Sequence, residues 1–187
     1  MDYEKIVMGI DPGTNVMGYG ILGINGRDLS PVILGVIELN KVGDHYLRLA
    51  RIYERITGLI DQYLPDELAI EAPFYGKNVQ SMLKLGRAQG VAMAAALARD
   101  IPICEYAPLK VKQVVTGNGG ASKEQVANML CYILKMKRET LPSLLDATDA
   151  MAVALTHYYE SRKPTPGVAA KNWEQFLRQH PERILRK

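Results

Sequence analysis

The sequence predicts an α/β fold in which a mixed five-stranded sheet is flanked by helices. The chain opens with three short apolar runs typical of strands, and later strand-like runs alternate with longer runs of helical periodicity. Its 187 residues have the size of one compact domain, and 48% hydrophobic residues are enough for a core. Strands that follow one another directly are expected to pair antiparallel, whereas strands joined through a helix are expected to run parallel.

The first half of the chain predicts a strand meander followed by a helix and a fourth strand. The expected strands of the meander are Glu4 to Asp11, Val16 to Ile24 and Pro31 to Leu39. Because Asn25-Gly26 is a strong hairpin signal between apolar runs, the last two should form a hairpin. The elements that follow are a helix from Tyr46 to Leu64, stopped by Pro65, and a strand from Glu67 to Glu71.

The second half predicts a long helix, a short strand and two or three further helices. These elements are a helix from Val79 to Arg99, a strand from Ile103 to Tyr106 and a last helix from Leu144 to Tyr159. Gly86 and Gly90 share one face of the long helix, so another element could approach closely there, either within the chain or in a second subunit. We expect residues 1–163 to form one domain and residues 164–187 to form a basic C-terminal tail.

Composition narrows the setting of the protein. The net charge of +3 and the isoelectric point of about 8.8 are compatible with a phosphate-bearing partner. Cys104 and Cys131 have no metal-ligand spacing, and their apolar contexts predict buried thiols in a reducing compartment. Neither a secretory signal nor a membrane-spanning run is apparent, which favours a cytoplasmic protein without a membrane partner.

Four acidic residues occupy positions where they could converge. Asp11 ends the first strand and Glu71 ends the fourth. Asp146 and Asp149 stand three residues apart at the start of the last helix, so their side chains share one face. In open α/β sheets the ligand site lies beyond the carboxyl ends of the strands. The sequence therefore predicts one acidic cleft at that edge of the sheet.

Carboxylates gathered in this way point to hard divalent cations. Four ionised groups would repel one another, and Mg²⁺ or Mn²⁺ removes that cost while accepting oxygen ligands. Two such ions about 3.5–4 Å apart can activate water and stabilise the leaving oxygen in phosphodiester hydrolysis.

Each acid also has a purely structural interpretation. Asp11 could belong to a turn, Asp146 could be a helix N-cap, and Asp149 could be a favourable first-turn acid. Glu71 could be solvated beyond its strand. The conjunction favours a site, because acids that end buried strands are costly without a partner.

Five blocks of the sequence resemble the RuvC family, and they occur in that family's order. The blocks are Gly9 to Thr14 with Gly18 to Gly20; Ala69 to Glu71 with Phe74 and Lys77-Asn78; Ser81 and Leu83 to Gly86 with Gly90 to Ala92; Tyr106-Ala107 with Val111 to Gln113 and Gly117 to Gln125; and Asp146 to Ala150 through Thr156-His157. Five ordered blocks are far more specific than one.

The resemblance implies an RNase H-like fold and a crossover (Holliday) junction endodeoxyribonuclease acting in DNA recombination and repair. Such an enzyme is a homodimer with two active sites, and its two nicks fall symmetrically across a four-way junction. The metal-binding acids would be Asp11, Glu71, Asp146 and Asp149, with Mg²⁺ or Mn²⁺ as the cofactor and two ions per subunit. The implied protein partners are RuvA and RuvB, which drive branch migration.

The resemblance also implies a set of DNA contacts. Phe74 would be the junction aromatic, and an apolar wedge can unstack bases at modest cost. Lys112 and Lys123 would be the basic DNA contacts, and Lys77, Lys84 and Arg87 could extend their track. The alternatives are a core aromatic for Phe74 and a solvated surface for the lysines. For His157 we expect a structural role.

Three other functions share some of these sequence features. A nuclease of the same fold acting in RNA processing would share Asp11 and Glu71 but lack the wedge and the long dimer helix. The Gly9 to Thr14 segment also resembles a phosphate loop of actin-like ATPases and sugar kinases, but those proteins need two such domains. A non-catalytic DNA-binding dimer would bind junctions without cutting them.

Overall fold

A computed structural model describes residues 2–73, 78–140 and 145–163 of the chain. The strands are β1 (Lys5–Asp11), β2 (Val16–Asn25), β3 (Asp28–Glu38), β4 (Glu67–Glu71) and β5 (Ile103–Tyr106). The helices are α1 (His45–Tyr63), α2 (Val79–Leu97), α3 (Pro108–Thr116), α4 (Lys123–Ile133) and α5 (Asp146–Ser161), with a 3₁₀ turn at Arg138–Thr140. The predicted elements are all present, with ends that differ by at most about three residues.

The five strands form one mixed sheet, as predicted, and their order in the sheet is β3-β2-β1-β4-β5. The meander β1-β2-β3 is antiparallel, and β4 and β5 return through helices to run parallel to β1. At the predicted hairpin, Asn25 pairs with Asp28 and Gly26 has a φ of 58°. A positive φ at the first loop position is what a tight two-residue hairpin turn needs, and glycine adopts it without strain.

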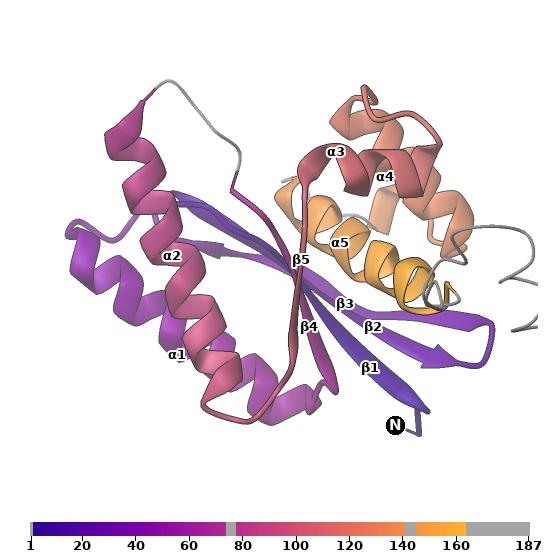
Figure 1. Cartoon of the computed structure of the whole chain (residues 1–187), viewed down its shortest axis with the longest axis horizontal. Coiled ribbons are helices and arrows are strands. Elements are labelled where there is room, and N and C mark those ends of the chain that lie inside the picture. Colours follow the sequence, from indigo (N-terminus) through magenta and orange to yellow (C-terminus); the bar gives the residue numbers. More distant parts are fainter. Residues whose placement is uncertain (1, 74–77, 141–144, 164–187) are drawn as a thin grey trace, which may run out of the picture.

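Helices cover both faces of the sheet, as Figure 1 shows, with α1 and α2 on one face and α3, α4 and α5 on the other. Alternate residues of one strand enter the two cores. In β1, Met8 and Ile10 pack with α1 and α2, whereas Val7 packs with α5. In β4, Ile70 packs on the first side and Ala69 on the second. The central strands are therefore apolar throughout, as expected for strands buried on both faces.

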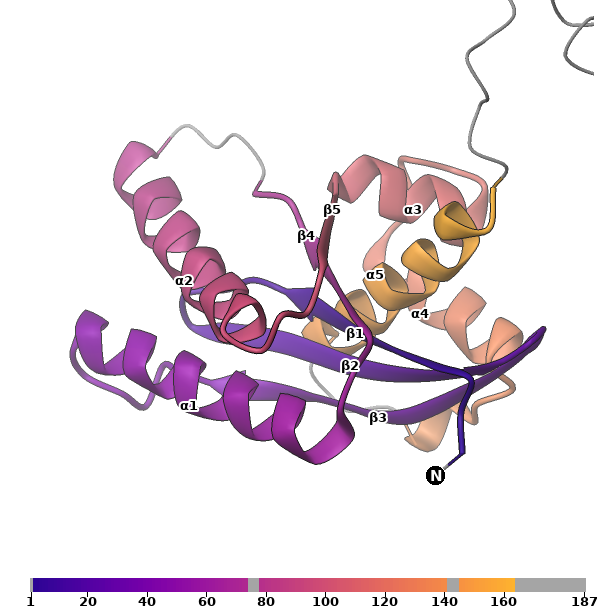
Figure 2. The same ribbon diagram turned by 60° about the horizontal axis from the view of Figure 1, so that its bottom comes forward.

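Helix α5 lies across the sheet (Figure 2), and its residues from Ala147 to Tyr158 are buried, with the exception of Asp149. Two glycines of the sheet allow this close approach. A Cβ atom at Gly9 would lie 2.1 Å from the main-chain oxygen of Ala150, and one at Gly18 would lie 1.9 Å from that of Asp146. The start of α5 can therefore rest directly on β1 and β2.

The structure corrects two predictions from the sequence. The cysteines are not buried, since Cys104 is exposed and Cys131 is half-buried. Cys104 belongs to β5, the edge strand, which has a neighbour on one side only. Gly86 and Gly90 serve no packing within the described residues, because a Cβ atom at either would meet nothing within 4 Å. Their alternative interpretation, contact with a second subunit, stays open.

Two further expectations concern the membrane and the tail. None of the helices in the part of the chain that the structure describes is long and apolar enough to cross a membrane. The predicted tail, residues 164–187, lies outside the described residues.

Candidate metal centre

Asp11 and Glu71 end two neighbouring strands on the same side of the sheet. Strands β1 and β4 are parallel and Ile10 pairs with Ile70, so the acids that follow lie side by side at the carboxyl edge. Because side chains alternate along a strand, Asp11 and Glu71 project to the face covered by α5.

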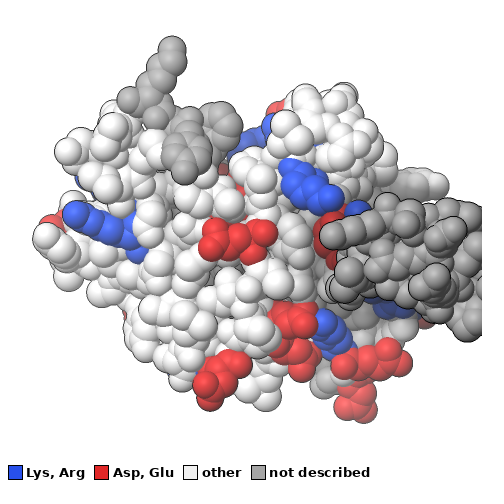
Figure 3. All heavy atoms as spheres, viewed as in Figure 1, with Lys and Arg blue, Asp and Glu red and all other residues white. Residues whose placement is uncertain are grey.

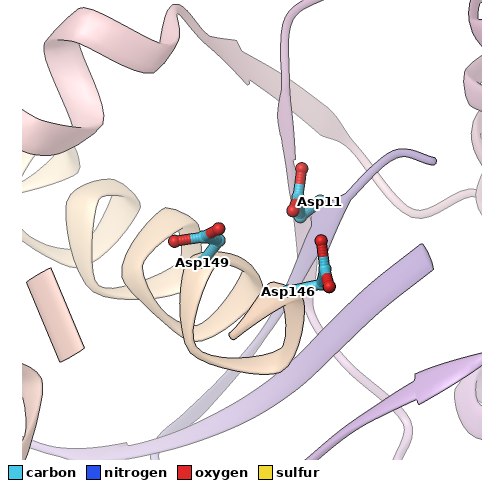
Figure 4. Close-up of side chains that lie close together, drawn as sticks. All are labelled: Asp11, Asp146 and Asp149. Atoms are coloured by element: carbon cyan, nitrogen blue, oxygen red, sulfur yellow. The ribbon is translucent and has the colours of Figure 1, made fainter. Parts of the chain in front are cut away.

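The first turn of α5 brings two more carboxylates to this edge. Figure 4 shows Asp146 and Asp149 rising from α5 toward the end of β1, where Asp11 lies. One carboxylate oxygen from each of the three lies within 4.8 Å of the others. Asp146 is the first residue of the helix, and its cap Leu145 makes no side-chain hydrogen bond, so the N-cap interpretation of Asp146 is wrong.

An open pocket of about 580 Å³ joins the acids to the helices α3 and α4. Its lining consists of Asp11, Glu71, Asp149, Ala107, Pro108, Leu109, Val111, Lys112, Gly119, Lys123 and Val126. Glu71 thus shares this pocket, although it does not belong to the tight group of three. On the face drawn in Figure 3, a notch at the upper edge separates the α2 side of the molecule from the α3 side, and both acidic and basic side chains show in it.

Three of the acids, Asp11, Glu71 and Asp149, have raised pKa values in the absence of a cation. Burial, together with the charges of Glu71, Asp149 and Asp146, raises the pKa of Asp11 from 3.8 to about 8. Burial and the charge of Asp149 raise the pKa of Glu71 from 4.5 to about 7. Burial likewise raises the pKa of Asp149, although the hydrogen bond and charge of Lys123 oppose the rise. These shifts show that the cluster has too little positive charge of its own.

Lys123 and Lys112 supply the positive charge that is present. The ammonium group of Lys123 donates a hydrogen bond to Asp149 and lies 3.7 Å from a carboxylate oxygen of Asp146. Burial acts to lower the pKa of Lys123, but the hydrogen bond and the neighbouring carboxylates outweigh it, and the net pKa is raised. The charge of Lys112 lowers the pKa of Glu71 and of Asp149.

The donor set fits a hard divalent cation. All the candidate ligands are carboxylate oxygens, the type that Mg²⁺ and Mn²⁺ prefer. A cation would replace the protons that Asp11 and Glu71 otherwise retain. Phe74 and Lys77, the other two predicted contacts, lie outside the described residues.

One feature near the centre was not apparent from the sequence. The side-chain amide of Gln89 is buried and donates to the main-chain oxygen of Glu71 at 3.3 Å, which ties the end of β4 to α2. A polar residue within the alanine-rich buried face of α2 was the available signal. His157 is structural, as expected, since it contacts Glu67 and lies 2.8 Å from the hydroxyl of Tyr106.

Comparison with known proteins identifies the family. A family model described as crossover junction endodeoxyribonuclease RuvC matches residues 7–157. A RuvC from Porphyromonas gingivalis is 58% identical over 184 residues, which cover 97% of both chains. A RuvC from Bacteroides fragilis is 57% identical over 181 residues, which cover 97% of this chain and 96% of the relative.

A solved structure extends the likeness to three dimensions. The T. thermophilus RuvC in complex with a Holliday junction substrate superposes with a TM-score of 0.77 and 31% identity, covering 85% of this chain and 96% of that one. The mixed sheet with helices on both faces is therefore the expected RNase H-like fold. By family match, full-length relatives and fold, the chain belongs to the RuvC family of crossover junction endodeoxyribonucleases.

Proposed function

We propose that the protein resolves Holliday junctions in DNA recombination and repair by making one nick in each of two symmetry-related strands. The observation that carries this proposal is the group formed by Asp11, Asp146 and Asp149, which opens into a pocket shared with Glu71 and two lysines. The solved T. thermophilus relative carries a Holliday junction substrate, which supports the same substrate here.

Asp11, Glu71, Asp146 and Asp149 would hold the divalent cations. We propose Mg²⁺, with Mn²⁺ as an alternative, and two ions per subunit. When bound, such ions activate water and stabilise negative charge at the reacting phosphate. The acids contribute by keeping a fixed set of oxygen donors at the edge of the sheet, where Gly9 and Gly18 let α5 lie close to β1.

The lysines would attract the phosphate and stabilise the charge that develops on it. Lys123 stays protonated because its carboxylate neighbours raise its pKa, so it acts as a donor of hydrogen bonds and not as a base. Lys112 lines the same pocket from α3. Phe74 and Lys77 would contact the junction from the segment that links β4 to α2.

A second subunit would supply the second nick. Along α2, Leu83 and Leu97 are exposed by 52% and 60%, and Gly86 and Gly90 stand open between them. An outward apolar stripe with small residues supports a homodimer contact. RuvA and RuvB would deliver the junction to this dimer.

The experiment that tests this function compares a mobile synthetic four-way junction with a linear duplex of the same sequence, in Mg²⁺ and in EDTA. We expect paired symmetric nicks in the junction alone, and none in EDTA. Asp11→Asn should abolish cleavage and preserve junction binding, because removing a negative charge eases the approach of phosphate. A junction that is bound but never cut, in Mg²⁺ or Mn²⁺, would favour a binding protein without catalysis. An active Asp11→Asn enzyme would contradict the metal assignment.

A further inference from the structure

A second, smaller pocket of about 300 Å³ opens beside the β1–β2 turn. It is lined by Thr14, Asn15, Gly43, His45, Arg48, Ser81 and Lys84. The turn that contributes Thr14 follows directly from Asp11, and three residues of chain span at most about 10 Å. The pocket therefore lies close to the metal centre, on the side of α1 and α2.

The lining of this pocket is positively charged. Arg48 and Lys84 contribute to it, and none of the described lining residues is acidic. The metal centre nearby has the opposite composition, with Asp11, Glu71 and Asp149 in its wall. A basic pocket next to an acidic cluster could accept an anion while the cluster holds cations.

Arg48 is fixed in place by the loops around it. Its Nε donates to the main-chain oxygen of Val42 at 2.7 Å. Its Nη1 donates to the main-chain oxygen of Thr14 at 3.1 Å and to the side-chain oxygen of Asn15 at 2.9 Å. Among the described residues, Nη2 makes no hydrogen bond. Such a guanidinium presents a preorganised donor, which is the form that suits phosphate oxygens.

Other polar groups of the pocket are also uncommitted. Within the described ranges, neither the ammonium group of Lys84 nor the hydroxyl of Ser81 has a hydrogen bond or ion pair, and Lys84 is exposed. The ring nitrogen Nε2 of His45 is buried and has no hydrogen-bond partner in the described part of the chain. Buried polar groups normally have hydrogen-bond partners, so the polar groups in this wall have hydrogen-bonding capacity that a ligand could use.

We propose that this pocket binds a backbone phosphate of the strand that is cut, within about three nucleotides of the reacting phosphate. The inference rests on the proposed function and adds a site to it. A phosphate held by Arg48 and Lys84 would fix the direction and register of the strand across the acids. Contacts of this kind position DNA without reading its sequence.

The test measures junction binding in an Asp11→Asn parent, so that cleavage does not interfere. Lys84→Gln is the probe, because Lys84 is exposed and its ammonium group makes no hydrogen bond or ion pair within the described part of the chain. Arg55→Gln is the matched control, since Arg55 is exposed on α1, loses the same charge and does not line the pocket. Arg48 is unsuited to the test because its hydrogen bonds hold two loops together.

The DNA probe is a set of junctions that each carry one neutral methylphosphonate within three nucleotides of the mapped cut. We expect Lys84→Gln to weaken binding several-fold and to reduce the salt dependence of log K by about 0.9, as for one lost phosphate contact. At one position, the neutral linkage should weaken junction binding by the parent but cause no further loss of affinity in Lys84→Gln. In Ser81→Ala, the neutral linkage at that same position should also cause no further loss of affinity. In Arg55→Gln, each neutral linkage should weaken binding by as much as it does in the parent.

Two results would overturn the inference. In the first, Lys84→Gln binds the junction with the affinity and salt dependence of Arg55→Gln. In the second, every neutral linkage weakens binding by Lys84→Gln as much as it weakens binding by the parent. If the parent binds the junction, either result contradicts the phosphate-binding role of the pocket but not the proposed function. If the Asp11→Asn parent does not bind the junction at all, both the proposed function and the pocket fail.

Discussion

At the level of single residues, Asp11 shows the conflict between stability and function. It ends a buried strand beside three other acids, and burial and their charges raise its pKa to about 8. A surface aspartate would avoid this cost, but it could not hold a cation at the edge of the sheet. In the role that we propose for the acids, binding of a cation would offset the loss of folding stability that their burial and repulsion cause in the metal-free protein.

This conflict predicts how the stability of the metal-free protein changes with pH. The folded protein binds the proton of Asp11 more tightly than the unfolded chain does, since the pKa is about 8 instead of 3.8. The resulting stabilisation is complete below about pH 4 and is lost as the pH rises to about 8. Glu71, with a pKa of about 7, adds a change of the same sign.

We therefore expect urea denaturation in EDTA to show wild-type protein less stable at about pH 9 than at about pH 6. Asp11→Asn cannot ionise, so it should lose less stability over the same interval and exceed the wild type at the higher pH. An equal loss in both proteins would contradict the raised pKa of Asp11.

Lys123 leads to a second prediction at this scale. Replacing it with glutamine removes the cation that contacts Asp149 and lies near Asp146. If Lys123 stabilises charge at the reacting phosphate, cleavage should fall by about 10²–10³. Lys110→Gln is the control, since Lys110 pairs with Glu160 at 3.1 Å and does not line the metal pocket. Single-turnover cleavage of the junction is measured for both variants. Equal rates would show that Lys123 does not contribute to the reaction.

At the level of elements, the contact between α5 and the sheet decides whether the acids meet. A methyl group at Gly18 would lie 1.9 Å from the main-chain oxygen of Asp146, so Gly18→Ala must push the first turn of α5 away. We expect a loss of about 1–3 kcal/mol in the free energy of unfolding, and weaker binding of Mn²⁺ by calorimetry.

Gly58→Ala provides the control for Gly18→Ala. Gly58 lies within α1, and a Cβ atom there would meet none of the described residues within 4 Å. This variant should be more stable by up to about 1 kcal/mol, because alanine favours a helix over glycine. If Gly18→Ala keeps wild-type stability and metal affinity, the close approach of α5 does not position the acids.

The elements were largely predictable because their signals are local. Helix α1 ends at Tyr63, two residues before Pro65. The hairpin turn follows Asn25, which forms the last β2–β3 pair with Asp28. Burial on an edge strand is not local, which explains why the exposure of Cys104 was missed.

The site was predictable to the extent that its acids end strands or begin a helix. The neighbouring positions of Asp11 and Glu71 follow from the parallel pairing of β1 and β4. The pocket around Arg48 was not predictable, because it joins a turn and two helices whose contacts depend on tertiary packing. The roles of the four acids and of the DNA-contacting residues stay predictions.

At the level of the whole molecule, symmetric cleavage requires two active sites related by a twofold axis. The homodimer contact that we propose uses the outward stripe of α2, where a Cβ atom at Gly86 or Gly90 would meet nothing within 4 Å in the described chain. Stable dimers bury more than about 1,000 Å² of well-packed surface. A long charged side chain in the middle of such a surface cannot be accommodated without a partner.

Gly90→Arg should therefore give a monomer in sedimentation experiments at concentrations where the wild type is a dimer. Among the described residues, nothing lies within 4 Å of a Cβ atom at Gly90, so the new side chain starts in open space. Gly58→Arg, equally open but on α1, should remain dimeric. On a junction, the Gly90→Arg variant should lose the coupling between the two nicks, since each subunit then meets the junction alone. A Gly90→Arg protein that is still a dimer with paired nicks would place the subunit contact on another face of the molecule.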